Sequence, residues 1–327
     1  MPVMNLVEAV RDALRTEMRR DPDVWIVGED VGKKGGVFGA TLGLYDEFGP
    51  QRVMDSPLTE SAIVGVGIGA ALYGTKPVCE IQFADFIFPA MNQIVSEAAK
   101  MRYRSNSAWT VPMVIRAPFG GGVHGGLYHS QSVEQYFTNT AGLKVVVPST
   151  PYDAKGLLIS AIRDPDPVLF FEHKGLYRAV KGEVPEGDYT IPIGKAEVKR
   201  DGTDITVITY GKVVHFCLEA AELLAREGYE ALVLDLRTLL PLDREAIVAA
   251  ARKTGKVLIA HEAGKTHGVG AEVAAIIAEE CLFDLDAPIQ RLCGPDVPAM
   301  PYAGPMEKFY MLSTEKCLAA MRELAQF

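Results

Sequence analysis

The chain has 327 residues, a length typical of about two domains. With 48% apolar and 23% charged residues, its composition is that of a folded globular protein, which excludes a disordered chain and a small disulfide-stapled scaffold. The net charge of −9 argues against nucleic-acid binding by the surface as a whole.

The cysteines and the apolar stretches indicate a cytoplasmic location and no membrane association. The five cysteines are scattered without a metal-binding spacing, as expected for reduced, mostly buried thiols. The first residues predict an amphipathic helix rather than a signal peptide. The longest apolar stretch, 62–73, is too short to span a bilayer.

Strand and helix patterns alternate along the first half of the chain. Short runs rich in β-branched residues predict strands at 24–27, 77–81, 112–116, 143–147 and 168–171. Helical periodicity predicts helices at 5–19, 59–73, 88–102 and 151–163. Such alternation indicates α/β layers around a mainly parallel sheet.

A second α/β domain is predicted after a linker. Residues 181–200 contain Pro and Gly and little helical periodicity, so the domains are placed at 1–180 and 201–327. The expected strands are 204–210, 231–235, 257–261 and 289–292, and the expected helices are 215–227, 243–252, 270–281 and 313–325. Ser313 is the expected N-cap of the last helix.

Three motifs with possible chemistry are set aside. The segment 263–266 resembles the end of a phosphate-binding loop, but Ile259 stands where that loop needs glycine. The glycines of 65–69 fall inside a predicted helix, whereas a dinucleotide fingerprint needs them at a strand-to-helix turn. His124 and His129 have no Cys or carboxylate at metal-ligand spacing.

Several segments taken together closely resemble the beta subunit of the decarboxylating component of 2-oxo acid dehydrogenase complexes. The resemblance extends over nearly the whole chain and includes Ser56-Pro57-Leu58-Thr59-Glu60. The segments that carry it are 28–31, 35–38, 52–65, 80–89, 101–104, 116–122, 127–131, 148–158 and 234–238. It implies a pyrimidine-binding domain of the thiamine-diphosphate fold followed by a transketolase C-terminal-like domain.

The resemblance also implies a cofactor shared between two chains. In the family, thiamine diphosphate lies between subunits, and the alpha subunit holds its diphosphate and Mg²⁺ through a Gly-Asp-Gly motif. No such motif occurs here, since Gly187-Asp188 is followed by Tyr189. The chain is therefore expected to work only with an alpha subunit, as an alpha2beta2 heterotetramer.

Glu60 and Phe86 match positions around the family's aminopyrimidine ring, and several of their neighbours are expected to line the same pocket. Glu60 matches the glutamate that hydrogen-bonds a ring nitrogen, although Glu also simply favours the first turn of a helix. Leu58, together with Ile63 and Val64, is expected to make its surroundings apolar. Gln82 and Phe86 are expected to line the ring pocket, and the alternative for Phe86 is a plain core aromatic.

The remaining implied features concern the reaction, a cation and a docking partner. His129 matches the active-site histidine of the family, with His124 a weaker candidate, and a surface histidine is the alternative. The acidic C-terminal domain is where relatives dock the peripheral subunit-binding domain of the dihydrolipoyl acyltransferase core. Potassium is implied at five backbone carbonyls, those of Val111, Met113, Ala161, Asp164 and Asp166.

Together these features predict a subunit that helps to decarboxylate a 2-oxo acid and to acylate a lipoyl domain. Residues 82–90 and 128–132 favour the branched-chain substrate 3-methyl-2-oxobutanoate. Pyruvate or acetoin is the alternative substrate. A stand-alone thiamine enzyme of the transketolase type, and a non-catalytic scaffold or regulatory subunit, are alternatives of other classes.

Overall fold

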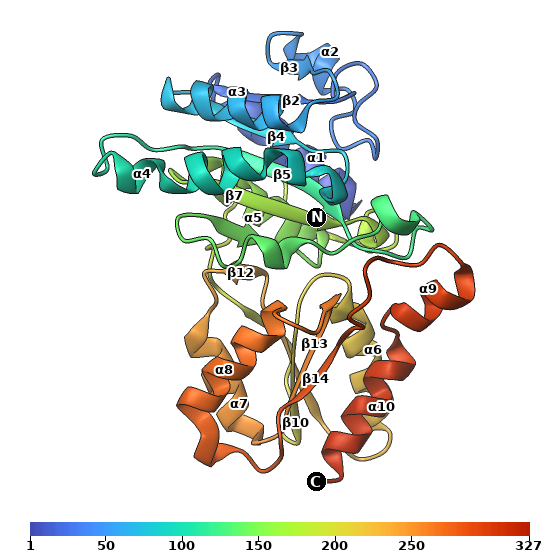
Figure 1. Ribbon diagram of the computed structural model, residues 1–327. Helices are drawn as coiled ribbons and strands as arrows, with labels where there is room; N and C mark the ends of the chain where they lie inside the picture. The colour runs from blue at the N-terminus through green and yellow to red at the C-terminus, as the bar shows by residue number, and fades with distance from the viewer. The chain divides into compact units, whose positions relative to one another are not determined.

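In a computed structural model, which describes residues 1–327, the chain folds into two compact units. The first unit comprises Met1–Phe119 and Tyr136–Ile193, and the second comprises Gly120–Gln135 and Gly194–Phe327. Each unit is an α/β layer structure built on a mainly parallel sheet, which confirms the predicted fold class (Figure 1). The segment 120–135 therefore belongs by its contacts to the second unit, although it follows a strand of the first.

The strands of the first unit lie in the order β6-β7-β5-β4-β2-β3, and every neighbouring pair is parallel. Their bounds are β2 (Val24–Gly28), β3 (Val53–Asp55), β4 (Lys76–Glu80), β5 (Val114–Phe119), β6 (Lys144–Val146) and β7 (Val168–His173). Strands β2, β5 and β7 are buried along their whole length. Parallel strands covered on both faces have this continuous apolar character, so the β-branched runs locate them well.

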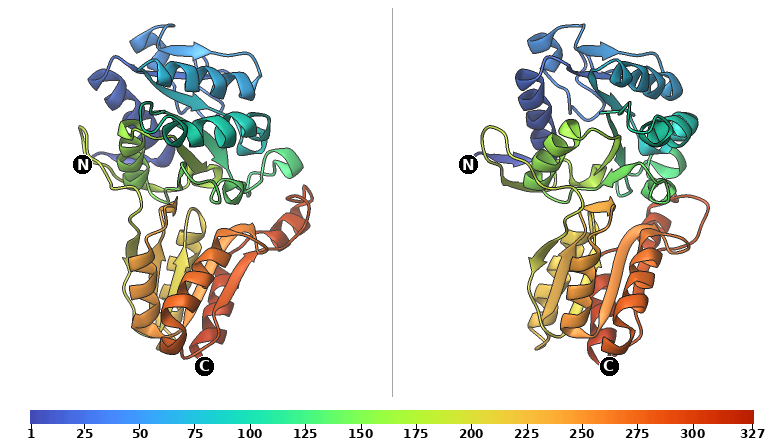
Figure 2. Two further views of the ribbon diagram at one scale, coloured as in Figure 1. Left: turned by 60° about the vertical axis from the view of Figure 1, so that its left-hand side comes forward. Right: turned by 90° about the vertical axis from the view of Figure 1, so that its left-hand side faces the viewer.

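Helices cover the two faces of this sheet, as the right-hand view of Figure 2 shows. Helices α1 (Leu6–Arg20) and α5 (Pro151–Arg163) pack on each other on one side, and α3 (Glu60–Leu72) lies on the other. Asn5 and Glu8 form a capping box at the start of α1. Thr150 caps α5 by accepting a hydrogen bond from the backbone N–H of Asp153. A short helix, α2 (Leu44–Phe48), precedes β3.

The predicted helix 88–102 differs in its hydrogen bonding. The chain there forms a 3₁₀ turn at Phe88–Ala90, a π-helical turn at Asn92–Glu97, a second 3₁₀ turn at Ala98–Lys100 and then α4 (Met101–Arg104). The buried residues Ala90, Ile94, Ala98 and Met101 recur at spacings that also suit an α-helix. Apolar periodicity therefore finds the buried face but not the wider turn.

In the second unit the strands lie in the order β14-β13-β10-β11-β9. The parallel strands are β10 (Ile205–Thr209), β11 (Ala231–Asp235), β13 (Val257–Gly264) and β14 (Gln290–Gly294), and β9 (Glu197–Arg200) joins antiparallel at one edge. A further short strand, β12 (Thr238–Leu240), follows β11. The sequence did not single out β9 or β12.

Two helix pairs flank this sheet (Figure 1). One pair is α6 (Val213–Ala225) with α10 (Thr314–Ala325), and the other is α7 (Arg244–Thr254) with α8 (Val269–Cys281). Ser313 caps α10 by accepting a hydrogen bond from the N–H of Lys316, as predicted. A short helix, α9 (Gly304–Tyr310), was not expected from the sequence.

The expected linker contains regular structure at both ends. β8 (Lys181–Glu183) pairs antiparallel with β1 (Val3–Asn5) in the first unit, and β9 lies in the second.

None of the helices is long and apolar enough to cross a membrane. All five cysteines are free thiols, and only Cys293 is partly exposed.

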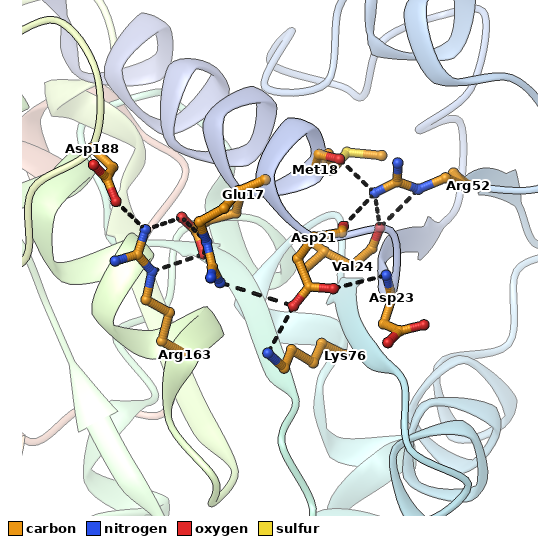
Figure 3. A network of polar contacts seen from close by, with 10 residues as sticks. Glu17, Met18, Asp21, Asp23, Val24, Arg52, Lys76, Arg163 and Asp188 are labelled. Atoms are coloured by element: carbon orange, nitrogen blue, oxygen red, sulfur yellow. Dashed lines mark hydrogen bonds and ion pairs between the residues drawn. The ribbon is translucent and has the colours of Figure 1, made fainter.

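A polar network ties the two ends of the first unit together (Figure 3). Glu17 on α1 is fully buried and accepts hydrogen bonds from Arg163 on α5 at 2.6 and 3.0 Å, while Arg163 also pairs with Asp188. Arg52 donates to the carbonyls of Met18, Asp21 and Val24, which lie at the end of α1 and the start of β2. The carbonyls of Met18 and Asp21 lie at the end of α1, where a helix leaves its last carbonyls without intrahelical partners.

A buried ionic cluster lies within the same sheet. Arg116 on β5 is fully buried and donates two hydrogen bonds to Glu172 on β7, at 2.6 and 2.7 Å, and one to Glu80 on β4, at 2.5 Å. The hydroxyl of Tyr177 donates to Glu172 at 2.5 Å. Burial raises the pKa of Glu80, and the guanidinium of Arg116 opposes that shift. One guanidinium therefore bonds to carboxylates on both of the strands that flank β5.

Replacing Arg116 with Met should lower the free energy of unfolding of the first unit by about 3–5 kcal/mol, because it leaves Glu80 and Glu172 buried without a counter-charge. Both tryptophans, Trp25 and Trp109, lie in the first unit, so urea denaturation followed by tryptophan fluorescence measures this change. Arg322→Met, which removes an exposed arginine of the second unit, is the control and should leave the midpoint unchanged. Equal midpoints for both variants would contradict the role given to Arg116.

Candidate active site

Glu60 is the first residue of α3 and is half-buried. The preceding N-cap residue, Thr59, makes no side-chain capping bond. Helix α3 follows β3, whose carboxyl end lies at the edge of the parallel sheet where ligands commonly bind in open α/β folds. The structure thus agrees with the expected place of Glu60 in the first turn of a helix.

The apolar residues near Glu60 separate into two groups. Ile63 and Val64 are buried in the first unit, with 3% and 0% of their surface exposed, whereas the side chain of Leu58 is 69% exposed. Within this chain Glu60 therefore lies at an apolar surface rather than in a closed pocket. Val66 on α3 and Tyr73, the residue after the helix, are 56% and 93% exposed.

Glu29 is a residue near Glu60 to which the sequence gave no role. It follows β2 directly, and burial raises its pKa, with further contributions from the negative charges of Asp30 and Glu60. Its Oε2 is buried without a hydrogen-bond partner. A carboxylate directly after a buried parallel strand was the available signal, because such positions meet at one edge of the sheet.

Gln82 and Phe86 lie on the segment after β4, at the same edge, and both are half-buried. Phe86 contacts Phe83 edge to face, with ring centroids 5.9 Å apart, and Phe83 contacts Phe38 in the same way at 5.5 Å. The Nζ of Lys174 lies 5.4 Å from the centroid of the Phe83 ring. Phe86 thus belongs to an aromatic cluster but keeps part of its surface accessible.

His129 lies in the second unit, on the glycine-rich segment Gly120–Gln135, and is half-buried. Gly125 packs so closely on it that an added Cβ would lie 2.7 Å from the Cβ of His129. Gly126 has a φ of +62°, a conformation that glycine adopts without strain. The structure therefore requires glycine in this loop, beyond mere flexibility. Glu60 and His129 belong to different units.

His124 has a contact of its own. Its Nδ1 lies 2.5 Å from Oε2 of Glu307 on α9, and its backbone N–H donates to Oε1 of the same carboxylate at 3.3 Å. Glu307 is buried, whereas the His124 side chain is 71% exposed. His124 therefore holds its loop against α9, which explains its presence without a catalytic role.

The five carbonyls expected to bind potassium come from three neighbouring segments. The carbonyls of Val111, Met113 and Ala161 each accept one backbone hydrogen bond, which leaves a second lone pair on each oxygen. The side chains of the two acidic residues are engaged with cations: Asp164 with Lys144 at 2.5 Å and Asp166 with Arg102 at 2.5 Å.

Comparison with known proteins agrees with this architecture. The model of the transketolase pyrimidine-binding domain matches residues 3–180, and that of the transketolase C-terminal domain matches residues 194–317. A solved structure, the inactive beta4 tetramer of a split-gene transketolase, aligns with a TM-score of 0.80 at 24% identity, over 99% of this chain and 98% of that one. At that identity the likeness shows the fold alone.

Similarity in sequence is more specific. The chain is 66% identical to the 2-oxoisovalerate dehydrogenase subunit beta of Bacillus subtilis over the full length of both chains. The chain belongs to the beta subunits of the 2-oxo acid dehydrogenases. It is also 48% identical to the pyruvate dehydrogenase E1 component subunit beta of the same organism, again over both full lengths. Membership in this family makes the chain part of a thiamine diphosphate-dependent enzyme and confirms the predicted resemblance.

A buried carboxyl group of the beta subunit lies at the end of the His129 loop. Glu134 is fully buried and accepts a hydrogen bond at 2.8 Å from the hydroxyl of Tyr210, the residue that follows β10. Burial, reinforced by the negative charge of Glu262, raises the pKa of Glu134 to about 7. Its Oε2 is buried without a hydrogen-bond partner. The sequence gave no sign of this, since Glu134 resembles an ordinary loop residue.

The raised pKa of Glu134 predicts a pH-dependent stability. Between its ordinary value of 4.5 and about 7, the folded chain keeps a proton that the unfolded chain releases, so the free energy of unfolding falls as the pH rises. Glu134→Gln has no proton to lose at this position, so this fall in the free energy of unfolding should be absent from the variant. The stability of the variant relative to the wild type should therefore rise by about 2–3 kcal/mol between pH 5 and pH 8, as measured by urea denaturation. A difference that does not change with pH would contradict the raised pKa.

Proposed function

We propose that this chain is the beta subunit of a dehydrogenase that decarboxylates the branched-chain 2-oxo acid 3-methyl-2-oxobutanoate and transfers the acyl group to the lipoyl domain of an acyltransferase. The observation that carries the proposal is the 66% identity to a 2-oxoisovalerate dehydrogenase beta subunit, against 48% to a pyruvate dehydrogenase beta subunit, each over the full length. Pyruvate or acetoin remains the alternative substrate.

The residues of the first unit suit the pyrimidine half of thiamine diphosphate. When bound, the cofactor supplies the carbon nucleophile that permits loss of carbon dioxide. Glu60 would hold a proton against a ring nitrogen, and the accessible face of Phe86 would pack on the ring. Leu58 would add an apolar contact to the ring, and Gln82 would add a polar one. The fit is supported by the exposed apolar surface beside Glu60 and by the unpartnered carboxylate oxygen of Glu29.

His129 is proposed to hold or move a proton as the acyl group passes to the lipoyl arm. An imidazole suits this task because its ordinary pKa lies near neutral pH. The close packing of Gly125 on His129 supports the proposal, since it fixes the main chain that presents the ring.

An alpha subunit is proposed to supply the rest of the site. The chain has no Gly-Asp-Gly motif, and it has no cluster of three or more His, Cys, Asp or Glu residues suited to a metal ion. The diphosphate and Mg²⁺ are therefore assigned to the alpha chain of an alpha2beta2 heterotetramer. Residues 61–75, which include most of α3, carry no charged side chain although part of the helix surface is exposed. An uncharged outer helix face suits burial against another subunit.

Two further partners are proposed, a protein domain and a cation. The acidic second unit would dock the basic peripheral subunit-binding domain of the dihydrolipoyl acyltransferase. Potassium would bind the carbonyls of Val111, Met113, Ala161, Asp164 and Asp166, of which the first three retain an acceptor lone pair.

Replacing Glu60 with Gln should lower the decarboxylation rate of the assembled alpha–beta enzyme by at least about 10²-fold, because an amide cannot pass a proton to the ring nitrogen. The rate is measured with 3-methyl-2-oxobutanoate and an artificial electron acceptor. Glu245→Gln is the matched control, because its side chain is 92% exposed on the first turn of α7 and should leave the rate unchanged. Unaffected turnover in Glu60→Gln would instead favour a non-catalytic scaffold.

The substrate assignment predicts a difference in kcat/KM. The assembled enzyme should use 3-methyl-2-oxobutanoate at least about tenfold better than pyruvate, since the branched substrate buries more apolar surface in a pocket of suitable size. Initial rates are compared over a range of concentrations of each acid. A preference for pyruvate would overturn the branched-chain assignment but not the reaction class.

A further inference from the structure

The loop that carries His129 is fastened to the second unit by a buried carboxylate. Glu262 lies on β13 and is 4% exposed. Its Oε1 accepts a hydrogen bond from the backbone N–H of Gly121 at 2.7 Å and another from the hydroxyl of Ser132 at 3.0 Å. Gly121 precedes His129 in the chain and Ser132 follows it. One oxygen atom therefore holds both ends of the loop.

Other contacts give the loop a defined shape around this point. The N–H of Gly120 donates to the carbonyl of Gln131 at 2.9 Å, which closes the loop at its base. The side chain of Gln131 donates to the carbonyl of Leu127 at 2.8 Å, so the two arms are also bonded to each other. Gly121 packs against methionine side chains: an added Cβ would lie 2.5 Å from Cε of Met300, which would have to shift. The loop therefore cannot move at its ends without breaking bonds to Glu262.

A carboxylate is well suited to this position. One carboxylate oxygen can accept two hydrogen bonds at once, and a buried carboxylate is destabilised when its donors are removed. Nearby Glu134, bonded to Tyr210, fixes the continuation of the chain beyond Ser132. Two buried acidic side chains thus hold the loop at its C-terminal end, and Glu262 alone of the two also holds its beginning.

We propose that Glu262 is a positioning residue: its carboxylate, bonded to Gly121 and Ser132, sets the loop conformation in which His129 meets the reacting group. The expected effect of Glu262 on acyl transfer rests on the function proposed above for His129. The expected effect of Glu262 on the order of the loop is independent of that function. Displacement of a catalytic group by about 1 Å costs on the order of 10²-fold in rate. Loss of this clamp, the pair of bonds from Gly121 and Ser132 to Glu262, should therefore lower the rate measurably.

The test compares Glu262→Ala and Glu262→Gln in the assembled alpha–beta enzyme. The glutamine Oε1 can accept the same two hydrogen bonds, so Glu262→Gln should keep acyl transfer to the lipoyl domain within about twofold of the wild type. Glu262→Ala should slow acyl transfer by about tenfold or more. The double variant Glu262→Ala/His129→Ala should be no slower than His129→Ala alone, because both changes remove the same contribution.

Hydrogen–deuterium exchange of the same proteins reports the loop without reference to activity. In Glu262→Ala, exchange in residues 120–132 should rise at least about tenfold while α7 and α8 keep wild-type rates. Glu279→Ala, an exposed change on α8, is the control and should alter neither measurement. If Glu262→Ala does not fold, Ser132→Ala removes one of the two bonds and should show a smaller change of the same kind.

Three results would overturn the proposal: wild-type exchange in the loop of Glu262→Ala, a rise in exchange throughout the second unit, or rate losses that multiply in the double variant. Failure of the proposed function gives a different result. The wild-type assembly would then oxidise neither 2-oxo acid, or His129→Ala would leave acyl transfer unchanged. In either case the local rise in exchange would still establish the clamp but without a catalytic role.

Discussion

The buried guanidinium of Arg116 is the interaction on which the first unit most depends. It lies on β5 and donates hydrogen bonds to carboxylates on the strands at either side, Glu80 on β4 and Glu172 on β7. Buried carboxylates without such a partner would strongly destabilise the sheet. Of these strands, β4 leads into the segment that carries Gln82 and Phe86, and β5 leads into the glycine-rich loop. The ionic cluster therefore fixes the strand ends from which both segments begin.

The second unit uses buried carboxylates for a different purpose. There Glu262, Glu134 and Glu307 bond to main-chain and side-chain donors of the loop 120–135 or of its neighbours. The loop follows a strand of the first unit and yet makes its contacts with the second. The half-site proposed for the first unit, centred on Glu60, is bordered by exposed apolar side chains such as Leu58. Both arrangements suit a subunit that completes its site only within an assembly.

The sequence predicted those features that depend on local pattern or on family motifs. The buried strands of both units, the capping role of Ser313 and the position of Glu60 at the start of a helix were all anticipated. The turns between 88 and 104 were not, because a π-helical turn buries the same apolar spacing as an α-helix. Glu262, Glu134 and Glu29 were missed because an isolated glutamate in a sequence gives no indication of whether it is buried.

By itself, the sequence determined the family and the α/β architecture and predicted the residues proposed to carry the chemistry, because apolar periodicity, glycine positions and a long ordered set of motifs are properties of the chain. Tertiary structure alone decided which carboxylates are buried and what they hold. Glu134 and Glu262 lie 128 positions apart in the sequence, and only folding brings them close enough to interact. Electrostatic and hydrogen-bonding partners depend on distance in space, which the order of residues does not specify.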